Sequence, residues 1–208
     1  MPELPIAVVH LDESCLGNGM DRPALGGAGG LIEARAGRDP VRREVFISSP
    51  NTTNNKMALA GAIAVLQLLG RKQKRIRTLL ISDSEYLVRG MREWVPGWIA
   101  RGWKRKDGAV ENLELWQVLV ASAAEHEVQL TWVRGHRGHP KNEYADRLAV
   151  RAAKEQITSA GAVDSGFDSW LAAQRAAGRY LDYDPDAAFA GVERRLAAGE
   201  RFPLDAGV

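Results

Sequence analysis

The sequence predicts an α/β fold, with a five-stranded mixed sheet flanked by helices and followed by a C-terminal extension. Two observations lead to this prediction. Apolar segments with strand or helix periodicity follow one another in the order strand, strand, strand, helix, strand, helix, strand, helix. Acidic residues, Asp12 and Asp83, stand at the ends of two of these strands, where the functional sites of open α/β sheets gather.

Three strands open the chain and are expected to form an antiparallel meander. PIAVVHLDESC (5–15) begins with a β-branched apolar run, and RREVFISS (42–49) alternates between apolar and polar residues. Between them, GGAGGLIEA (26–34) leads from a glycine cluster into the second strand. These glycines could bring backbone amides close to a phosphate, but we attribute them to a tight strand connection, which is commoner. Because the joining loops are short, we expect consecutive strands to pair.

Helices and strands alternate after the meander. NTTNN (51–55) offers residues that can cap a helix, which we expect to run to about Leu69 and to pack on the sheet. IRTLLISDS (76–84) and VQLTWVRGH (128–136) are the fourth and fifth predicted strands. Further helices are expected from about Tyr86, over 142–156 and over 186–200.

The chain is expected to divide near residue 155. Residues 1–155 carry the alternating pattern and form the predicted domain, whereas the pattern weakens beyond about Ser159. We therefore describe residues 156–208 as a C-terminal extension of unknown role.

The composition is that of an ordinary globular protein. Hydrophobic residues make up 45% and charged residues 26% of the 208 residues, and a net charge of +2 says little about the partner. The single cysteine, Cys15, favours a reducing compartment. We see no signal peptide and no apolar run near the roughly 20 residues that span a bilayer. These observations predict a cytoplasmic protein that does not contact membranes.

Several motifs, in the right order, resemble those of type 1 ribonucleases H. TWVRGHRGHPKNEYADRLAVRAA (131–153) is similar to their C-terminal signature, and NTTNNKM (51–57) to the start of their central helix. LLISDSEYLV (79–88) resembles their fourth strand, and REWVPGWIARGWKRKDGAVENLELWQVL (92–119) their basic protrusion. The resemblance covers about residues 5–155. It implies a ribonuclease H-like fold and cleavage of the RNA strand in RNA/DNA hybrids.

The resemblance also implies two divalent metal ions, Mg²⁺ or Mn²⁺, held by carboxylates. Asp12, Asp83 and Asp146 match three of the family acids. Two such ions can serve both the attacking water and the leaving oxygen of a phosphodiester, and they prefer hard oxygen ligands. A fourth family acid, the glutamate directly after the methionine of NNxM, falls on Ala58, which cannot bind a metal.

Glu13 is our candidate for the missing acid. Type 1 enzymes carry a glycine directly after the first aspartate, whereas type 2 ribonucleases H carry adjacent Asp-Glu there and lack the helix glutamate. The chain therefore resembles a type 1 enzyme with a type 2 arrangement of acids. Since adjacent strand residues point to opposite faces, we expect the strand to end or bulge at Glu13. The alternatives are an alanine engineered at position 58 and a natural binder without activity.

Four further residues surround the predicted site. His136 matches a family histidine thought to assist proton transfer or product release, and we place it among the catalytic residues. We interpret His139 as structural. Glu143 either stabilises the start of a helix or lies around the metal ligands. Glu85 is a weaker alternative ligand.

Predicted substrate contacts fall in three stretches. Amide side chains can contact the sugars and base edges of a hybrid, although the same residues can simply cap a helix. Cations interleaved with tryptophans can hold DNA phosphates while a ring packs on a sugar, although a packed aromatic stripe explains part of that pattern. The predicted contacts are Ser14, Cys15, Thr53, Asn54, Asn55, Trp94, Trp98, Trp103, Lys104, Arg105 and Lys106.

Two other functions remain open from the sequence. A catalytically inactive hybrid-binding module would keep the asparagines and the basic protrusion but would not cleave. A nuclease or integrase of the same superfamily would act on DNA. We favour the ribonuclease, and the sequence leaves its protein partners and oligomeric state unknown.

Overall fold

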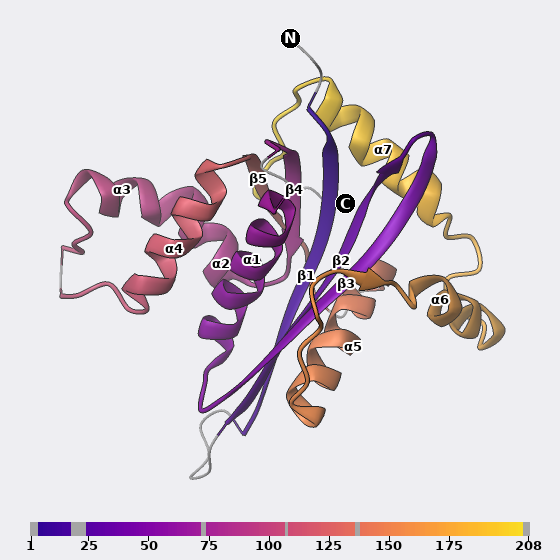
Figure 1. The fold of residues 1–208 in the computed structure, drawn as a ribbon, viewed down its shortest axis with the longest axis horizontal. Coiled ribbons are helices and arrows are strands. Elements are labelled where there is room, and N and C mark those ends of the chain that lie inside the picture. The colour runs from indigo at the N-terminus through magenta and orange to yellow at the C-terminus, as the bar shows by residue number, and fades with distance from the viewer. Residues whose placement is uncertain (1–3, 18–23, 72–73, 107, 136–137, 206–208) are drawn as a thin grey trace.

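The computed structural model describes residues 4–17, 24–71, 74–106, 108–135 and 138–205. Its strands form one sheet in the order β5-β4-β1-β2-β3-β6 (Figure 1). The strands are β1 (Ile6–Leu16), β2 (Leu25–Ala36), β3 (Asp39–Pro50), β4 (Arg77–Ser82), β5 (Glu127–Trp132) and β6 (Val163–Asp164). The helices are α1 (Asn54–Gly70), α2 (Glu85–Arg89), the π-helical turn η1 (Gly90–Trp94), α3 (Val95–Ala100), α4 (Leu113–Ala124), α5 (Pro140–Glu155), α6 (Phe167–Ala176) and α7 (Pro185–Ala197).

The sheet confirms the predicted fold class. β1, β2 and β3 form an antiparallel meander, and β4 and β5 run parallel to β1. The described sheet has six strands rather than the five predicted, because the extension adds β6 at the outer edge of β3. An ion pair between Arg43 and Asp164 accompanies this pairing. A strand of two residues has no periodicity of its own, so no sequence pattern indicated it.

Alternation along β1 separates two faces of the sheet. Val9 and Leu11 point into a buried cluster shared with α1, α2 and α4. Val8 points to the other side, where Phe189 and Leu196 of α7 cover the sheet. In Figure 1, α1 to α4 accordingly lie on one side of β1 and α5 to α7 on the other. We call these sides the α1 face and the α5 face.

The glycine cluster of β2 allows α5 to approach the sheet closely. A Cβ atom at Gly27 would lie 2.2 Å from the carbonyl oxygen of Ala149, and one at Gly29 would lie 2.5 Å from that of Ala145. Both glycines lie within the ladder of β2, so our attribution of the cluster to a tight connection was wrong. The close approach brings α5 against β1 and β2.

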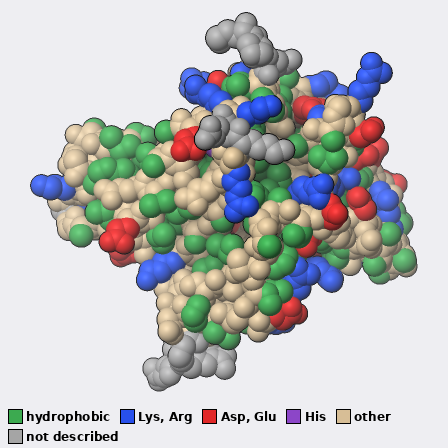
Figure 2. All heavy atoms as spheres, viewed as in Figure 1, with side chains coloured by type: hydrophobic (Ala, Val, Ile, Leu, Met, Phe, Trp, Pro, Cys, Tyr) green, Lys and Arg blue, Asp and Glu red, His purple; other side chains and the backbone are tan. Residues whose placement is uncertain are grey.

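The extension packs onto the same domain instead of standing apart from it. Phe167 of α6 is fully buried in a cluster with Tyr144 and Leu148 of α5. At the other side of the molecule, α3 and the loop that follows it project away from the sheet (Figure 1). In Figure 2, Lys and Arg side chains are spread over the visible face with acidic ones between them, in keeping with the small net charge. No helix within the described ranges is long and apolar enough to cross a membrane.

Candidate active site

Three acids meet where β1 passes the end of β4. Asp12, Glu13 and Asp83 each offer one carboxylate oxygen, and these three oxygens lie within 4.8 Å of one another. Asp83 follows directly on β4, and Asp12 and Glu13 lie within β1. A group of hard oxygen ligands at this spacing could hold a divalent metal ion.

Asp12 and Glu13 are neighbours on one strand, and both can reach Asp83 because β4 ends before β1 does. The pairing of β1 with β2 continues without interruption from Ala7 to Leu16, so the strand neither ends nor bulges at Glu13, contrary to our expectation. On its other side, β1 pairs with β4 only as far as Leu11, opposite Ser82. Beyond that residue the edge of β1 is open. Asp12 from the α5 face and Glu13 from the α1 face can therefore both turn around this edge towards Asp83.

Asp12 is buried and strongly perturbed. It is 6% exposed, and burial raises its pKa to about 9, with further contributions from the charges of Asp83, Glu13 and Asp146. The backbone N–H of Glu13 donates to its Oδ1 at 2.7 Å and opposes this rise. The amide of Asn142 donates to its Oδ2 at 3.2 Å. The carboxylate is therefore oriented, yet it is hard to ionise without a cation.

The pKa of Glu13, which lies on the α1 face, is raised as well. Burial, followed by the charge of Asp83, raises its pKa to about 7, and a hydrogen bond with Ser84 at the start of α2 opposes the rise. Within the described part of the chain, no Lys or Arg forms an ion pair with Asp12 or Glu13. Crowded, buried acids are the arrangement that a bound metal ion would stabilise.

Asp83 is held through its backbone and crowded by a neighbouring loop. The indole N–H of Trp132 donates to its carbonyl oxygen at 2.9 Å. A Cβ atom at Gly135 would lie 2.2 Å from its Oδ2, so only glycine lets this loop pass so close to the carboxylate. Gly135 belongs to the RGHRGHP motif. Its close approach to Asp83 is a steric reason for a glycine at this position.

Asp146, the remaining predicted acid, and Ala58 lie on opposite faces of the sheet. Asp146 of α5 is near enough to raise the pKa of Asp12, but its carboxylate is not in the group within 4.8 Å. Ala58 of α1 is 4% exposed and belongs to the buried cluster with Val9 and Leu11. Position 58 therefore faces the same side of the sheet as Glu13.

Three other residues were predicted around the site: His136, His139 and Glu85. His136 lies outside the described residues. His139 precedes α5, and its Nδ1 accepts the backbone N–H of Asn142 at 3.2 Å, which is a capping role. Glu85 is exposed and paired with Arg89 at 3.1 Å.

Two contacts of α5 escaped the sequence analysis. Asn142, 2% exposed, reaches Asp12 from the first turn of α5, and an amide inside the KNEYAD motif was the available signal. Glu143 forms an ion pair with Arg179 of the extension at 2.6 Å. The extension thus contacts the helix that carries Asp146.

The predicted contacts on β1 and α1 differ in exposure. Thr53 caps α1 by accepting the backbone N–H of Lys56 at 3.3 Å. Asn54 and Asn55 are exposed beside it and line a hollow of about 460 Å³ between the starts of α1 and α4. Ser14 and Cys15 are half-buried near the end of β1. The Cys15 thiol donates to the carbonyl of Thr52 at 3.5 Å.

The projecting segment combines an aromatic stripe with exposed cations. The ring centroids of Trp94 and Trp98 lie 6.0 Å apart, and Trp98 packs on the buried Trp116 at 5.6 Å. Trp103 is half-buried against the same cluster. The cations are exposed: Lys104, Arg105 and Lys106. The packed stripe therefore accounts for the tryptophans and leaves the cations available to a ligand.

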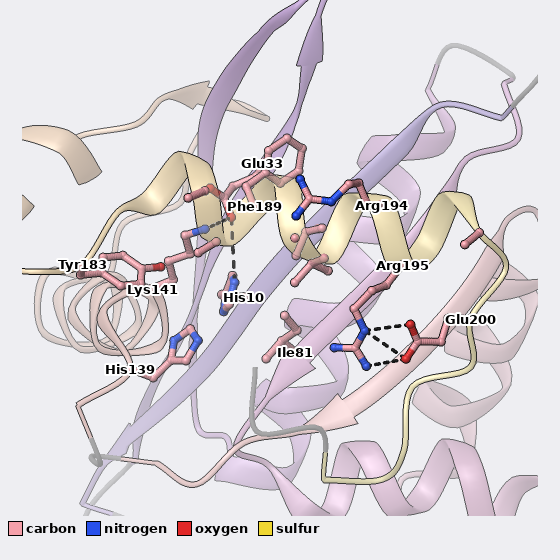
Figure 3. A pocket seen from close by; sticks show the side chains of 16 residues that line it. His10, Glu33, Ile81, His139, Lys141, Tyr183, Phe189, Arg194, Arg195 and Glu200 are labelled. Carbon is pink, nitrogen blue, oxygen red and sulfur yellow. Dashed lines mark hydrogen bonds and ion pairs between the residues drawn. The ribbon is translucent and has the colours of Figure 1, made fainter.

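A second group of buried charges lies on the α5 face. Glu33 of β2 is fully buried, and its carboxylate lies 2.6 Å from the Nζ of Lys141 and 3.1 Å from the Nε of Arg42. His10 lies 4.0 Å from it, and burial, together with His139 and Lys141, holds the pKa of His10 well below its usual range. Figure 3 shows His10 and Lys141 pointing towards Glu33 beside a cavity of about 580 Å³ that α7 covers.

Comparisons with known proteins agree with this architecture. The model of the RNase H family matches residues 5–154. Ribonuclease HI of Pseudomonas aeruginosa is 44% identical over 149 residues, covering 71% of this chain and 93% of that protein. Ribonuclease H of Cupriavidus necator is 42% identical over 147 residues, covering 70% and 94%.

Solved structures agree as well. LC9-RNase H1, described as a type 1 RNase H with the type 2 active-site motif, is 50% identical with a TM-score of 0.77, covering 83% of this chain and 82% of that one. LC11-RNase H1 in complex with an RNA/DNA hybrid has a TM-score of 0.51 at 20% identity, which supports the fold alone. The chain therefore belongs to the ribonuclease H family of endoribonucleases, and within it to the type 1 enzymes.

Proposed function

We propose that this protein cleaves the RNA strand of RNA/DNA hybrids with the help of two divalent metal ions. The observation that carries the proposal is the cluster of Asp12, Glu13 and Asp83, whose carboxylate oxygens lie within 4.8 Å of one another, with burial and neighbouring carboxylates raising the pKa values of Asp12 and Glu13. Family membership supports the reaction. Asp146, whose charge reaches Asp12, completes the proposed ligand set.

The chain's own residues would prepare the site. Asp12, Glu13, Asp83 and Asp146 would hold Mg²⁺ or Mn²⁺, and Asn142 keeps one oxygen of Asp12 in a fixed direction. When bound, the two ions would activate a water molecule and stabilise the leaving oxygen. His136 would assist proton transfer or product release, as the resemblance implies.

We propose Glu13 as the fourth carboxylate. It lies on the same face of the sheet as Ala58, so it approaches the other acids from the side where type 1 enzymes carry a helix glutamate. LC9-RNase H1, which is 50% identical, is described as having the type 2 motif in a type 1 enzyme. This description supports a relocated carboxylate rather than an inactivated site.

The hybrid would be held on the side of α1 and the projecting segment. The exposed Asn54 and Asn55 can donate to and accept from sugars and base edges, and Thr53 presents its hydroxyl beside them. Lys104, Arg105 and Lys106 can contact DNA phosphates, with Trp94, Trp98 and Trp103 supporting them. Ser14 and Cys15 would lie near the RNA strand.

Two broader proposals accompany the activity. We assign it to residues 1–155, with residues 156–208 serving that domain. We place it in the cytoplasm, since a single cysteine suits a reducing compartment.

Cleavage of a labelled hybrid tests the proposal. The wild type is compared with Glu13→Gln, Ala58→Glu and the double variant, in Mg²⁺ and in Mn²⁺. We expect Glu13→Gln to lose at least about 10²-fold in kcat, because a metal ligand is removed, and the added glutamate to restore part of it in the double variant. Glu85→Gln is the matched control, since this nearby glutamate is exposed and paired with Arg89, and it should cleave like the wild type.

The other outcomes discriminate between the alternatives. A wild type that cleaves only after Ala58→Glu would identify an inactivated form. A wild type that binds the hybrid but never cleaves it in either metal would identify a binding module. Full activity of Glu13→Gln would overturn the role of Glu13.

A further inference from the structure

The chain returns to the sheet after α7. The segment 200–205 follows β5, and Asp205 forms a parallel bridge with Trp132. The backbone N–H of Trp132 donates to the carbonyl of Leu204 at 2.6 Å. The segment therefore gives β5 a partner on its outer side, at the end nearest the acids.

Three side chains fix this segment in place. Arg92 donates through Nη1 to the carbonyls of Phe202 at 3.0 Å and Pro203 at 2.8 Å. The hydroxyl of Thr131 donates to the carbonyl of Pro203 at 3.0 Å. Gln129 accepts the backbone N–H of Phe202 at 2.9 Å. Phe202 itself is 2% exposed, so both its backbone and its ring are anchored.

Trp132 connects the segment to the acids. Its backbone is bonded to Leu204, and its indole N–H donates to the carbonyl of Asp83 at 2.9 Å. β4 ends at Ser82, so Asp83 lies just beyond the regular ladder and depends on contacts of this kind. Like charges tend to drive Asp83 away from Asp12 and Glu13, and a rigid neighbour opposes that movement.

We propose that residues 200–205 act as a clamp that, through Trp132, holds Asp83 in position for metal binding. Trp132 is then a positioning residue, and the end of the extension is part of the catalytic apparatus although it touches neither metal nor substrate. This inference rests on the proposed function, because it assigns Asp83 to the metal site.

Two variants break the clamp at different points. Truncation after Pro203 removes residues 204–208, and with them the bond from the hydroxyl of Thr131 to the carbonyl of Leu204 at 3.2 Å. It leaves the carbonyls of Phe202 and Pro203, to which Arg92 and Thr131 donate. Trp132→Phe keeps an aromatic ring and removes only the indole N–H. Trp170→Phe is the matched control, because this half-buried tryptophan packs on Tyr144 and Phe167, away from the acids.

The measurements are Mn²⁺ affinity by titration calorimetry and steady-state cleavage of a hybrid. We expect both clamp variants to bind Mn²⁺ about 10-fold more weakly and to lose kcat in proportion, with KM for the hybrid unchanged. Combining them should cost no more than the worse single change, because both act through Trp132. Trp170→Phe should alter the melting temperature only.

Three results would overturn the clamp. Unchanged Mn²⁺ affinity and kcat in a truncated protein that merely melts earlier would leave the segment a purely structural role. Additive losses would show that the segment does not act through Trp132. A wild type that binds no Mn²⁺ would remove the clamp together with the metal site, whereas one that binds Mn²⁺ without cleaving would contradict the proposed function and leave the affinity test of the clamp decisive.

Discussion

Two groups of buried charges lie along β1 and β2, and they are built on opposite principles. Around Glu33, a buried carboxylate is matched by two cations, Lys141 and Arg42, which oppose the rise that burial causes in its pKa. Around Asp12, the nearest charges are other carboxylates, and every one of them raises the pKa further. In the first group, cations favour ionisation of the acid, whereas in the second the neighbouring carboxylates oppose it.

This difference distinguishes a group of charges that holds the fold together from a group that can bind a cation. Removing one partner of a buried ion pair strongly destabilises a fold. In the Glu33 group, Lys141 of α5 contacts both Glu33 of the sheet and the carbonyl of Pro185 at the start of α7. A group of crowded, buried acids destabilises the fold until a cation arrives. Changes to the two groups should therefore affect stability in opposite directions.

The largest effect is expected from Asp12→Asn. The change removes the most buried acid of the proposed site, so we expect kcat for hybrid cleavage to fall by about 10³-fold or more. Because it also removes the cost of burying this acid beside Asp83 and Glu13, the metal-free variant should melt at a higher temperature than the wild type. The cleavage assay measures the loss of kcat, and calorimetric melting in EDTA measures the melting temperature. Lower stability would contradict our view of the cluster.

Glu33→Gln should show the reverse pattern. It leaves Lys141, which is 2% exposed, with an uncompensated buried charge, whereas Arg42 keeps its ion pairs with Asp168 and Asp186. We expect a loss of about 3–5 kcal/mol in the free energy of unfolding. Urea titration measures it. The control is Glu193→Gln, whose partner Arg35 lies at the surface, and it should cost about 1 kcal/mol or less. Equal losses in the two variants would remove the distinction.

Asn142→Ala tests an intermediate case, since Asn142 supports the acids without carrying charge. Loss of its hydrogen bond to Asp12 should weaken Mn²⁺ binding and activity by about 10–100-fold. Calorimetric titration with Mn²⁺ and the cleavage assay provide the measurements. Wild-type affinity in this variant would mean that Asp12 is oriented by other contacts.

The last prediction concerns the dependence of stability on pH. Folding raises the pKa of Asp12 to about 9 and that of Glu13 to about 7, so the metal-free folded state binds more protons than the unfolded state between their unfolded and folded values. Their contribution to stability is complete in acid, below the unfolded pKa values, and is lost as the pH rises through about 7 and then about 9. Unfolding in EDTA across this range measures the slope. Asp12→Asn should flatten its alkaline part, and an unchanged slope would show that Asp12 does not cause it.

The sequence predicted the elements whose periodicity is strong. The strands from β1 to β5, and helices α1, α5 and α7, all appear near their expected positions, because hydrophobic spacing alone specifies them. β6 and the purpose of the glycines in β2 could not be predicted, since both depend on which distant element packs there.

The candidate site was predictable in its residue types but not in its geometry. Asp12 and Asp83 stood out as acids at strand ends, and the motifs added Asp146. The route of Glu13 around an open strand edge depends on where β4 stops, and the contact of Asn142 depends on how closely α5 approaches β2. A local sequence pattern predicts neither the residue at which β4 ends nor the distance between α5 and β2. The role of His136 stays a prediction.

The extension meets the sheet at both of its sides: β6 pairs with β3, and Asp205 bridges to Trp132 of β5. Exposed strand edges are templates on which a second chain can add its own strand, and proteins that leave them bare are prone to aggregate. A chain shortened to the predicted domain would expose β3 and the end of β5 together. The final fifty residues thus also protect the protein against self-association, so their loss should first be seen as precipitation at high concentration.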